Sequence, residues 1–585
     1  VVKIRPAANL TVNLGPAPAV TMGAKWRRVG TTSWLEAGST EEAAPAGPHL
    51  VEFLELGDWR APTPIPVNLA DNQSLVLDAT YIPRSSELSW ASYFGGTSMD
   101  HGYGAALDAQ GNVWLTGDTT SSRPFISKWS ADGALLWSTN ITDFPGPHAG
   151  FAVTSDTQGN AIVVGVTRGA YWTVGGYQTN YGGNGDGFVA KLSPNGAPLW
   201  STYLGGTNYD CAYAVVVDAA NNILVTGYTA SSNWVSGSLD NTHNGGDDAF
   251  AVKLSPSGAH VWSTYLGGAN TDRGYGIATD TAGNVIVAGS TYSSGWVLGG
   301  FDNTYNGGSD AFVIKLNPAG SHLWATYLGG TNYDCAYAVA VDAADNLLVT
   351  GETSSTNWIS GGFDETYNGG SDAFVFKLSP GGLPLWSTYL GGTNGDAGRG
   401  IACDAAGNVL LTGTTSSGGW AAGGPDLVHD GDSDAFAAKL TPGGAHLWSS
   451  YVGGTNTDQG EAIATDGAGR VVIAGSTKSP GWMPNGWDTS HNGDWDAFVV
   501  SLADRPLPLI RIQSIERVSD SSFRLIFTVT ADPPPALQVQ RTLSLAAPVS
   551  WVPETSAVIT PLAPGLFQAD VPRQGGQCYH RLHRP

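Results

Sequence analysis

Short stretches in which small or apolar residues alternate with polar ones recur along most of the chain. Between residues 274 and 330 four of them follow one another, GYGIATD, NVIVAGST, DAFVIKL and HLWATYLGG, and each ends at a turn. Such alternation is typical of half-buried β-strands. The first two stretches are joined by an Asp-x-x-Gly-Asn type linker, as in residues 280–284 and 404–408, where Asp caps its own turn and Gly or Asn accepts a positive φ. We therefore expect units of four short strands with hairpin connections.

This unit is repeated seven times. A tryptophan opens the same motif at positions separated by 47, 63 and then four times 62 residues: Trp90, Trp137, Trp200, Trp262, Trp324, Trp386 and Trp448. A fixed period of this length indicates a solenoid or a propeller. The array begins with a lone fourth strand, LSWASYF (88–94), and ends with a third strand that lacks a fourth, DAFVVSL (496–502). The two ends complete each other, which favours a ring of seven four-stranded blades, because closure removes both exposed sheet edges.

Composition agrees with an all-β chain and excludes some partners. Glycine supplies 79 of 585 residues while only 13% are charged, which indicates many tight turns between short strands. The formal charge of -23, without any basic patch, excludes nucleic acid as a partner. No apolar run approaches the roughly 20 residues of a membrane helix. The first residues lack the apolar core of a signal peptide, so we expect that a signal has already been removed if the protein is exported.

The YLGG, GYT and DAFVxKL motifs of residues 88–502 resemble the bacterial seven-bladed β-propeller repeats of the SBBP type. The likeness is specific in five of seven units. The first unit lacks the long loop after its second strand, and the second has WSTNITDFPGPHAG (137–150) in place of YLGG. The resemblance implies a secreted bacterial protein, located outside the cell or on its surface.

Both flanks of the array are β-patterned as well. In residues 1–84 the order GAKWRRVG, TSWLEAG, GPHLVEFLELGDW resembles the PEGA-like domains of bacterial surface proteins. In residues 509–585 the strands SFRLIFTVT and GLFQADVP, with the pieces WVPETS and YHRL, resemble immunoglobulin- or fibronectin-like terminal modules of secreted bacterial proteins. We expect three domains, namely an N-terminal β-sandwich (1–84), the propeller (88–502) and a C-terminal β-sandwich (509–585). Likeness of fold alone says little about their role.

Two sets of aspartates recur at equivalent positions. The first set stands just before the innermost strand, where it either converges on the mouth of the central channel and attracts cations or accepts backbone N–H bonds in its own turn, the role that we favour. Its members are Asp100, Asp210, Asp272, Asp334, Asp396 and Asp458. The second set ends the same strand inside the hairpin linker and is predicted to be structural. Its members are Asp108, Asp156, Asp218, Asp280, Asp342, Asp404 and Asp466.

Two loops carry oxygen-bearing residues at alternate positions, the spacing that calcium loops use. They are HDGDSDAF and HNGDWDAF, and neither has the glycine and the closing glutamate of an EF-hand. Calcium is the one cofactor that the sequence suggests. The predicted ligands are Asp430, Asp432, Asp434, Asn492, Asp494 and Asp496.

A tryptophan recurs in the long loop after the second strand, beside Ser, Asn and Gly. Tryptophans on one face of a propeller can stack on the rings of a glycan. The alternative, which we favour, is that each indole fills a gap between blades. The residues are Trp172, Trp234, Trp296, Trp358, Trp420 and Trp482.

No catalytic motif is present, since the sequence lacks HExxH, GxSxG and a phosphate-binding loop, and its histidines are scattered. A hydrolase remains an alternative, because its two catalytic carboxylates can be far apart in the sequence and meet only in the folded chain. Five third-strand lysines are expected to point outward or to pair with a neighbouring acid: Lys191, Lys253, Lys315, Lys377 and Lys439. Four cysteines without zinc-site spacing are expected to be isolated thiols: Cys211, Cys335, Cys403 and Cys578.

These features lead to three hypotheses of function. The first is a non-enzymatic extracellular scaffold or adhesion protein that assembles with further copies of itself, or with other surface proteins, into a filament or surface layer, for instance by strand addition through its flanking domains. The second is a lectin-like propeller whose tryptophan loops and carboxylates bind a glycan, with or without calcium. The third is a polysaccharide hydrolase or lyase.

Overall fold

The structure is a computed structural model in which the chain divides into two compact units, residues 85–504 and the two flanks 1–84 and 505–585. The described residues are 8–15, 20, 24–29, 31, 33–54, 59–60, 65–70, 74–80, 82–83, 87–119, 123–141, 148–237, 239–466, 469–483, 486–503 and the strands of the C-terminal flank given below. Cys578 and both chain ends lie outside these residues.

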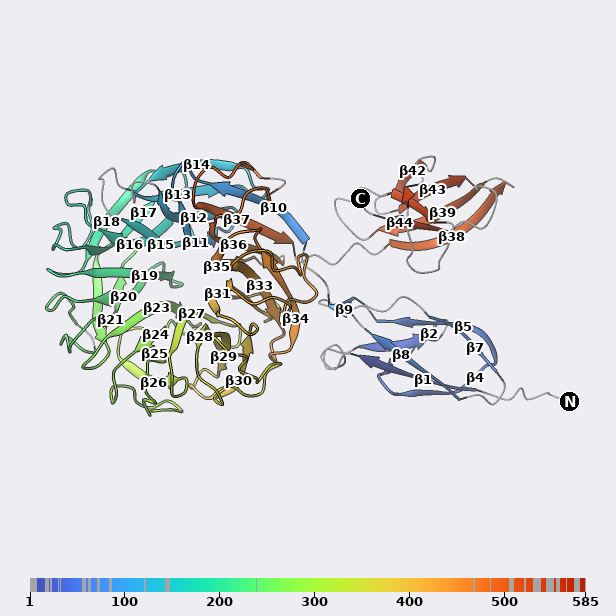
Figure 1. The fold of residues 1–585 in the computed structure, drawn as a ribbon, viewed down its shortest axis with the longest axis horizontal. Coiled ribbons are helices and arrows are strands. Elements are labelled where there is room, and N and C mark those ends of the chain that lie inside the picture. The colour runs from blue at the N-terminus through green and yellow to red at the C-terminus, as the bar shows by residue number, and fades with distance from the viewer. Residues whose placement is uncertain are drawn as a thin grey trace. The chain divides into compact units, whose positions relative to one another are not determined.

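Seven four-stranded antiparallel sheets make up residues 85–504, and every element with described bounds is a strand (Figure 1). This confirms the all-β repeat of four-stranded sheets. From inner to outer strand, the first four sheets are β11 (His101–Leu107), β12 (Val113–Thr119), β13 (Arg123–Trp129), β14 (Leu135–Asn140); β15 (Ala149–Ser155), β16 (Ala161–Thr167), β17 (Asp186–Leu192), β18 (Pro198–Leu204); β19 (Asp210–Val217), β20 (Ile223–Thr229), β21 (Asp248–Leu254), β22 (His260–Leu266); and β23 (Asp272–Thr279), β24 (Val285–Thr291), β25 (Asp310–Leu316), β26 (His322–Leu328). The other three are β27 (Asp334–Val341), β28 (Leu347–Thr353), β29 (Asp372–Leu378), β30 (Pro384–Leu390); β31 (Asp396–Cys403), β32 (Val409–Thr415), β33 (Asp434–Leu440), β34 (His446–Val452); and β35 (Asp458–Thr465), β36 (Arg470–Thr477), β37 (Asp496–Ala503), β10 (Glu87–Phe94).

The sheets lie around a common centre in chain order (Figure 1). Each inner strand contacts the inner strand of the next sheet, and β11 contacts β35, so that the first sheet also touches the last. Strand β10 comes from the start of the array but pairs with β37 at its end, with Tyr93 opposite Phe498. At this seam the indole N–H of Trp90 donates to the carbonyl of Ala131 at 3.0 Å.

The hydrophobic core lies between neighbouring sheets. Every residue of the second and third strands of the fourth sheet, β24 and β25, is buried. One cluster joins Ile286 and Val313 of that sheet to Leu347 and Phe374 of the next. Full burial of such a side chain stabilises the fold by roughly 1.5–3 kcal/mol, and therefore every junction between sheets favours the same apolar residues in each repeat.

A long loop covers the outer edge of most fourth strands. In the fifth sheet, the N–H of Ser387 donates to Ser360 O at 2.8 Å and that of Tyr389 to Asp364 O at 2.9 Å. Equivalent bonds from the loop reach β18, β22, β26, β34 and β10. They occupy edge groups that would otherwise be free to pair with another chain.

The flanks consist of smaller sheets. The N-terminal flank has the sheets β4-β1-β8 and β3-β2-β5-β7 and the pair β6-β9, with Leu10, Trp26 and Val51 buried. Their strands are β1 (Ala8–Gly15), β2 (Lys25–Arg28), β3 (Leu35–Glu36), β4 (Thr40–Ala44), β5 (Gly47–Phe53), β6 (Trp59–Arg60), β7 (Ile65–Leu69), β8 (Ser74–Thr80) and β9 (Ile82–Pro83). The C-terminal flank has the sheets β38-β39-β43-β42 and β41-β40-β44, made of β38 (Ile510–Ser519), β39 (Ser522–Val529), β40 (Gln538–Thr542), β41 (Val552–Pro553), β42 (Val558–Ala563), β43 (Leu566–Pro572) and β44 (Tyr579–His583). Within the described parts of the chain no helix has both the length and the apolar character needed to cross a membrane.

Candidate functional site in the central cavity

Each inner strand has a β-bulge at one equivalent position. In β23 the pairing register shifts between Gly274 and Gly276, so Tyr275 has no partner residue on β24. Bulges turn a side chain away from the regular alternation of a strand and are enriched beside binding sites. We call the seven residues at these positions the bulge ring: Tyr103, Phe151, Tyr213, Tyr275, Tyr337, Arg399 and Glu461.

Small residues on both sides of each bulge let the inner strands approach closely. A Cβ atom at Gly276 would lie 2.9 Å from the Cα of Ala338 in the next sheet, and one at Gly400 would lie 3.0 Å from the backbone N of Ile463. Any larger side chain would push the inner strands apart. The small neighbours therefore fix the diameter of the ring into which the bulge residues project.

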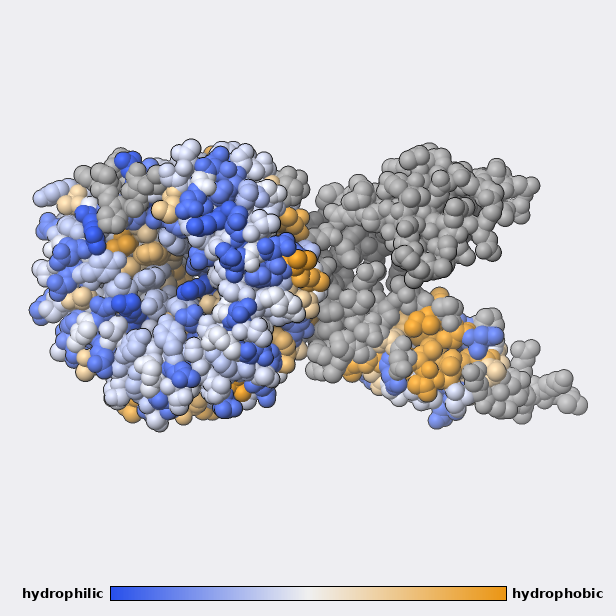
Figure 2. Space-filling view, in the orientation of Figure 1, coloured by the Kyte–Doolittle hydropathy of each residue, from blue (hydrophilic) through white to orange (hydrophobic). Residues whose placement is uncertain are grey.

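The bulge ring and the two residues that follow each of its members line a cavity of about 570 Å³. The size lies within the range of roughly 300–1,000 Å³ typical of small-molecule sites. Next to the bulge ring, the cavity wall consists of small or aliphatic residues such as Val215, Ile277 and Val339. By contrast, the visible outer face of the sheet array is mostly hydrophilic (Figure 2).

Five aromatic rings follow one another around the cavity. The rings of Phe151 and Tyr213 are stacked, with centroids 4.8 Å apart and planes at 12°. Successive centroids from Tyr103 to Phe151, from Tyr213 to Tyr275 and from Tyr275 to Tyr337 lie 5.4, 5.1 and 5.5 Å apart. All five are half-buried, so part of each ring faces the cavity. Such faces bind flat or apolar ring surfaces by stacking.

The other side of the cavity is charged. The guanidinium of Arg399 lies 4.1 Å from the ring centroid of Tyr337, a cation–π contact, while the Tyr337 hydroxyl donates to Glu352 Oε1 at 2.7 Å. Glu461 projects from the next sheet. Burial raises the pKa of Glu461, and the positive charges of Arg399 and His101 oppose that rise. The cavity thus combines aromatic faces with one cation and one anion.

The first set of aspartates does not line this cavity, contrary to the channel-mouth interpretation. Asp272 is fully buried and accepts hydrogen bonds from Gly268 N at 2.8 Å, from Ser293 Oγ at 2.9 Å and from Thr291 Oγ1. Burial raises the pKa of this carboxyl despite these bonds, and it raises that of Asp210 to about 6. Turn and loop donors hold the carboxylates inside the fold at the start of the inner strands. The same Gly, Thr and Ser contacts recur for Asp210, Asp334, Asp396 and Asp458, and Asp100 accepts the N–H of Gly96.

The loop tryptophans are packed into the fold rather than presented as a stacking surface. Trp296 meets Phe312 edge to face at 5.1 Å, and its indole N–H donates to Thr291 Oγ1 at 3.0 Å. These contacts are the packing that the plug interpretation expects. The edge-to-face contact with a third-strand Phe recurs for Trp172, Trp234, Trp358, Trp420 and Trp482.

The six predicted calcium ligands do not converge. Asp434 and Asp496 are buried and accept the backbone N–H groups of Asp430 and Asn492, whereas Asp432 is exposed. Asp494 lies 3.3 Å from Lys478 Nζ. Asp434 and Asp496 each begin a buried strand, which separates them from the exposed loop, and no group of three or more His, Cys, Asp or Glu side chains in the described residues is placed to hold a metal ion.

Asp434 and Asp496 belong instead to a third recurring set of aspartates, at the start of the third strand. In Asp310, Oδ2 accepts the N–H of Asn306 at 2.9 Å, while Oδ1 is buried without a hydrogen-bond partner. Asp334 of the next sheet adjoins it, because its N–H donates to Ser309 O at 2.7 Å. Burial raises the pKa of Asp310 to about 7, and the charge of Asp334 acts in the same direction. The buried unpartnered oxygen recurs in Asp186, Asp248, Asp372, Asp434 and Asp496.

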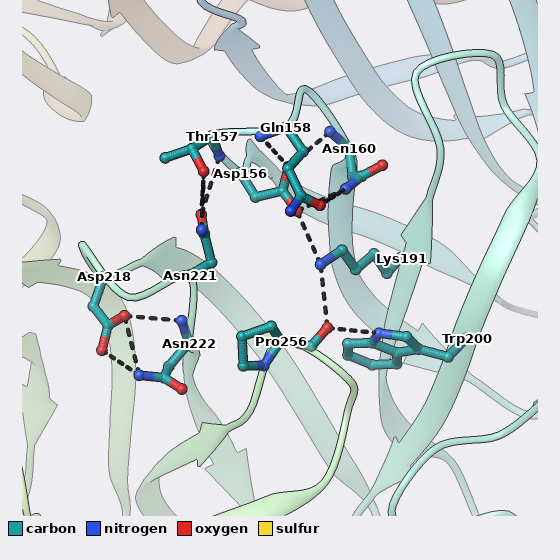
Figure 3. Close-up of polar contacts among 10 residues, drawn as sticks. All are labelled: Asp156, Thr157, Gln158, Asn160, Lys191, Trp200, Asp218, Asn221, Asn222 and Pro256. Atoms are coloured by element: carbon teal, nitrogen blue, oxygen red, sulfur yellow. Dashed lines mark hydrogen bonds and ion pairs between the residues drawn. The ribbon is translucent and has the colours of Figure 1, made fainter.

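The second set of aspartates and the lysines form a latch between sheets. Lys191 Nζ lies 2.9 Å from Asp156 Oδ2 in its own sheet and donates to the carbonyl of Pro256 in the next sheet at 3.2 Å (Figure 3). The indole N–H of Trp200 donates to the same carbonyl at 3.1 Å. Burial raises the pKa of Asp156, but hydrogen bonds from Asn160 and Lys191 outweigh it and leave the pKa lowered. The predicted pairing is present, with both partners buried. Equivalent ion pairs join Lys128 to Asp108, Lys253 to Asp218, Lys315 to Asp280, Lys377 to Asp342 and Lys439 to Asp404, and Asp466 pairs with Arg470.

The bulge ring escaped the sequence-based prediction, although a signal for it exists. Six of its seven members stand three residues after an aspartate of the first set. At this position the residue varies among the repeats, from Tyr to Arg and Glu, while the residues on either side stay small. Of the cysteines, Cys211, Cys335 and Cys403 are free thiols, as expected. Burial raises the pKa of Cys403 to about 11, which leaves its thiol protonated at neutral pH.

Comparison with known sequences supports the repeat architecture. Four segments match the beta-propeller repeat family SBBP, namely residues 199–233, 261–295, 323–357 and 385–419. An uncharacterized WD repeat-containing protein of Acanthamoeba polyphaga mimivirus is 24% identical over 443 residues, covering 60% of this chain and 32% of that protein. The regulatory protein FlaEY of Caulobacter vibrioides is 25% identical over 427 residues, covering 67% of this chain and 42% of that protein. The chain therefore spans less than half the length of either relative.

Two solved structures are also similar. A gluconolactonase from Xanthomonas campestris has a TM-score of 0.29 and 10% identity, and covers 56% of this chain and 93% of its own. An ulvan lyase of polysaccharide lyase family PL25 has a TM-score of 0.36 and 11% identity, and covers 67% of this chain and 93% of its own. Similarity at these TM-scores carries no conclusion about the activity of this chain.

Proposed function

We propose that this chain is a secreted, non-enzymatic binding protein whose seven sheets form one closed propeller, flanked by β-sandwich domains over residues 1–84 and 509–585. Its ligand site is the central cavity. The ligand is a small molecule or a glycan unit with at least one ring face. This proposal keeps the lectin-like hypothesis but moves its site from the tryptophan loops to the bulge ring.

The observation that carries the proposal is the bulge ring itself. Seven bulges at one equivalent position direct side chains into one cavity, and five of these side chains are aromatic. The sheet architecture does not require an aromatic residue at this position, since Arg399 and Glu461 occupy it in two of the seven sheets. What the seven sheets share is the direction in which the bulge residue points, and not its residue type. A common direction with varied chemistry is what a binding site needs.

Isothermal titration calorimetry with a panel of mono- and oligosaccharides and small ring compounds tests the proposal. We expect the intact chain to bind at least one member, and Tyr213→Ala to weaken that binding at least tenfold, equivalent to about 1.4 kcal/mol. The matched control is Tyr292→Ala, at a tyrosine that is 42% exposed outside the cavity lining. Absence of binding across the panel, or equal affinity of Tyr213→Ala and the intact chain, would refute a site in the cavity.

A self-assembling extracellular scaffold is our second candidate, favoured by the outer strand of the first sheet. Unlike the other six outer strands, β14 receives no hydrogen bonds from a covering loop among the described residues. Ser138, Thr139 and Asn140 are exposed, and Leu136 is 51% exposed. A free edge of uncharged residues pairs readily with an identical edge in antiparallel orientation across a two-fold axis.

Sedimentation velocity over a range of protein concentrations tests this second candidate. We expect a larger species that grows with concentration and is lost in Ser138→Pro, because proline removes the outward N–H yet is tolerated on an edge strand. Ser138→Ala keeps that N–H and serves as the control. A single species near 60.7 kDa at all concentrations would exclude self-assembly.

A further inference from the structure

The charged side of the cavity restricts the ligand class further, an inference that rests on the proposed binding site. Arg399 and Glu461 project from adjacent inner strands, and both line the cavity. Among the described contacts, Arg399 has the ring of Tyr337 as its neighbour but no ion pair, and Glu461 has neither an ion pair nor a hydrogen bond. Two opposite charges thus lie on adjacent strands of the cavity and attract one another, but neither is held by an ion pair.

The other charged groups nearby are already engaged. His101 Nδ1 lies 3.1 Å from Asp118 Oδ1, and Glu352 accepts the hydroxyl of Tyr337. A charge that is partly removed from water costs free energy until it gains a counter-charge or hydrogen bonds. Arg399 and Glu461 are therefore the groups of the bulge ring for which contact with a ligand should be most favourable.

From this arrangement we infer that the cavity binds an amphoteric ligand, which carries a carboxylate and an ammonium group on the same small molecule next to a flat ring. The carboxylate meets the planar fork of Arg399, which accommodates it through two parallel N–H donors. The ammonium group meets Glu461 and the faces of the neighbouring aromatic rings. The ring of the ligand stacks on the Phe151 and Tyr213 side, where two parallel aromatic rings already lie together.

A ligand with a single charge fits less well. A carboxylate alone would be placed beside Glu461 as well as Arg399, and an ammonium group alone beside Arg399 as well as Glu461. Either case adds a repulsion between like charges that offsets part of the attraction. A neutral sugar avoids repulsion but supplies no counter-charge, so that each of the two side chains keeps only the attraction of the other charges around the cavity.

Calorimetry with three related probes separates these cases at pH 7. L-Phenylalanine carries both charges, L-phenylalaninamide only the ammonium group, and N-acetyl-L-phenylalanine only the carboxylate. Cellobiose serves as a neutral ring-bearing probe. We expect phenylalanine to bind at least tenfold more tightly than the other three.

Two substitutions should then exchange the order of the singly charged probes. Glu461→Gln should weaken the amide and strengthen the N-acetyl compound, whereas Arg399→Met should do the opposite. Arg399→Lys keeps the charge without the fork and should weaken both carboxylate probes less than Arg399→Met does. The matched control is Lys478→Met, at a lysine paired with Asp494 away from the cavity lining.

The outcomes separate the inference from the function on which it rests. Preferential binding of phenylalanine with the crossed pattern supports both. Binding of cellobiose that is weakened by Tyr213→Ala but unchanged by Glu461→Gln would overturn the amphoteric ligand and leave the cavity site standing. Failure of all four probes and of the saccharide panel would overturn both.

Discussion

Removal of one buried acid should flatten the pH dependence of stability, and Asp310→Asn is the perturbation of choice. The amide oxygen of Asn can still accept the N–H of Asn306, which Asp310 Oδ2 accepts at 2.9 Å, and it cannot ionise. Asp310 is fully buried, and burial raises its pKa from its ordinary value of 3.8 to about 7. The neutral acid is thus the form that the folded chain prefers.

The sign follows from linkage. Because the folded pKa lies above the unfolded one, the contribution of Asp310 to stability is complete below about pH 4 and is lost as the pH rises through about 7. One pKa unit corresponds to about 1.4 kcal/mol, so the change between pH 8 and pH 5 amounts to about 2–3 kcal/mol for this carboxyl. The latch carboxylates act in the opposite direction, since the lowered pKa of Asp280 makes its contribution present at neutral pH and lost as the pH falls through that lowered value. Stability should therefore be greatest in mildly acidic solution.

Urea unfolding between pH 5 and pH 8, followed by tryptophan fluorescence, measures this effect. The intact chain should be more stable at pH 5 than at pH 8, and Asp310→Asn should lose about 2–3 kcal/mol of that difference. Asp432→Asn, at an exposed carboxylate, should leave the difference unchanged. The reasoning would be refuted if Asp310→Asn retained the full pH dependence of the intact chain.

Two further substitutions test the latch and the loop tryptophans. Lys315→Met leaves the buried carboxylate of Asp280, now 2.8 Å from Lys315 Nζ, without its partner, and should lower the free energy of unfolding by about 3–5 kcal/mol. The double variant Lys315→Met, Asp280→Asn should regain part of this loss. If the losses of the two single variants simply add in the double variant, the two groups are not coupled. Trp296→Phe removes the hydrogen bond to Thr291 and should cost about 1–2 kcal/mol in urea unfolding without changing ligand affinity. Loss of ligand binding in that variant would restore the tryptophan loop as a binding site.

Local patterns were sufficient for the strands. GYGIATD, NVIVAGST, DAFVIKL and HLWATYLGG lie in β23 to β26, because period-two alternation and hairpin residues act within a few positions of one another. The pairing of Lys315 with Asp280 could also be predicted from the sequence, since both residues recur at fixed positions.

The proposed binding site was not predictable in the same way. The direction of Tyr275 depends on the bulge between Gly274 and Gly276, and the need for a glycine there comes from the close approach of Ala338, which lies about sixty residues further along the chain. The buried oxygen of Asp310 has a similar origin, because its surroundings include Asp334 of the next sheet. Alternation along one strand contains no information about such contacts between sheets.

Two positions of the bulge ring separate the proposed recognition chemistry from the packing between sheets. Tyr275 and Tyr337 lie outside the apolar cluster that joins the fourth and fifth sheets, and a replacement at either position leaves that cluster intact. Such positions can change residue type without changing the core, whereas Tyr103, Phe151 and Tyr213 also pack against a small buried cluster. A gene family built on such repeats can acquire new ligand preferences one position at a time, without first acquiring extra stability to tolerate the change.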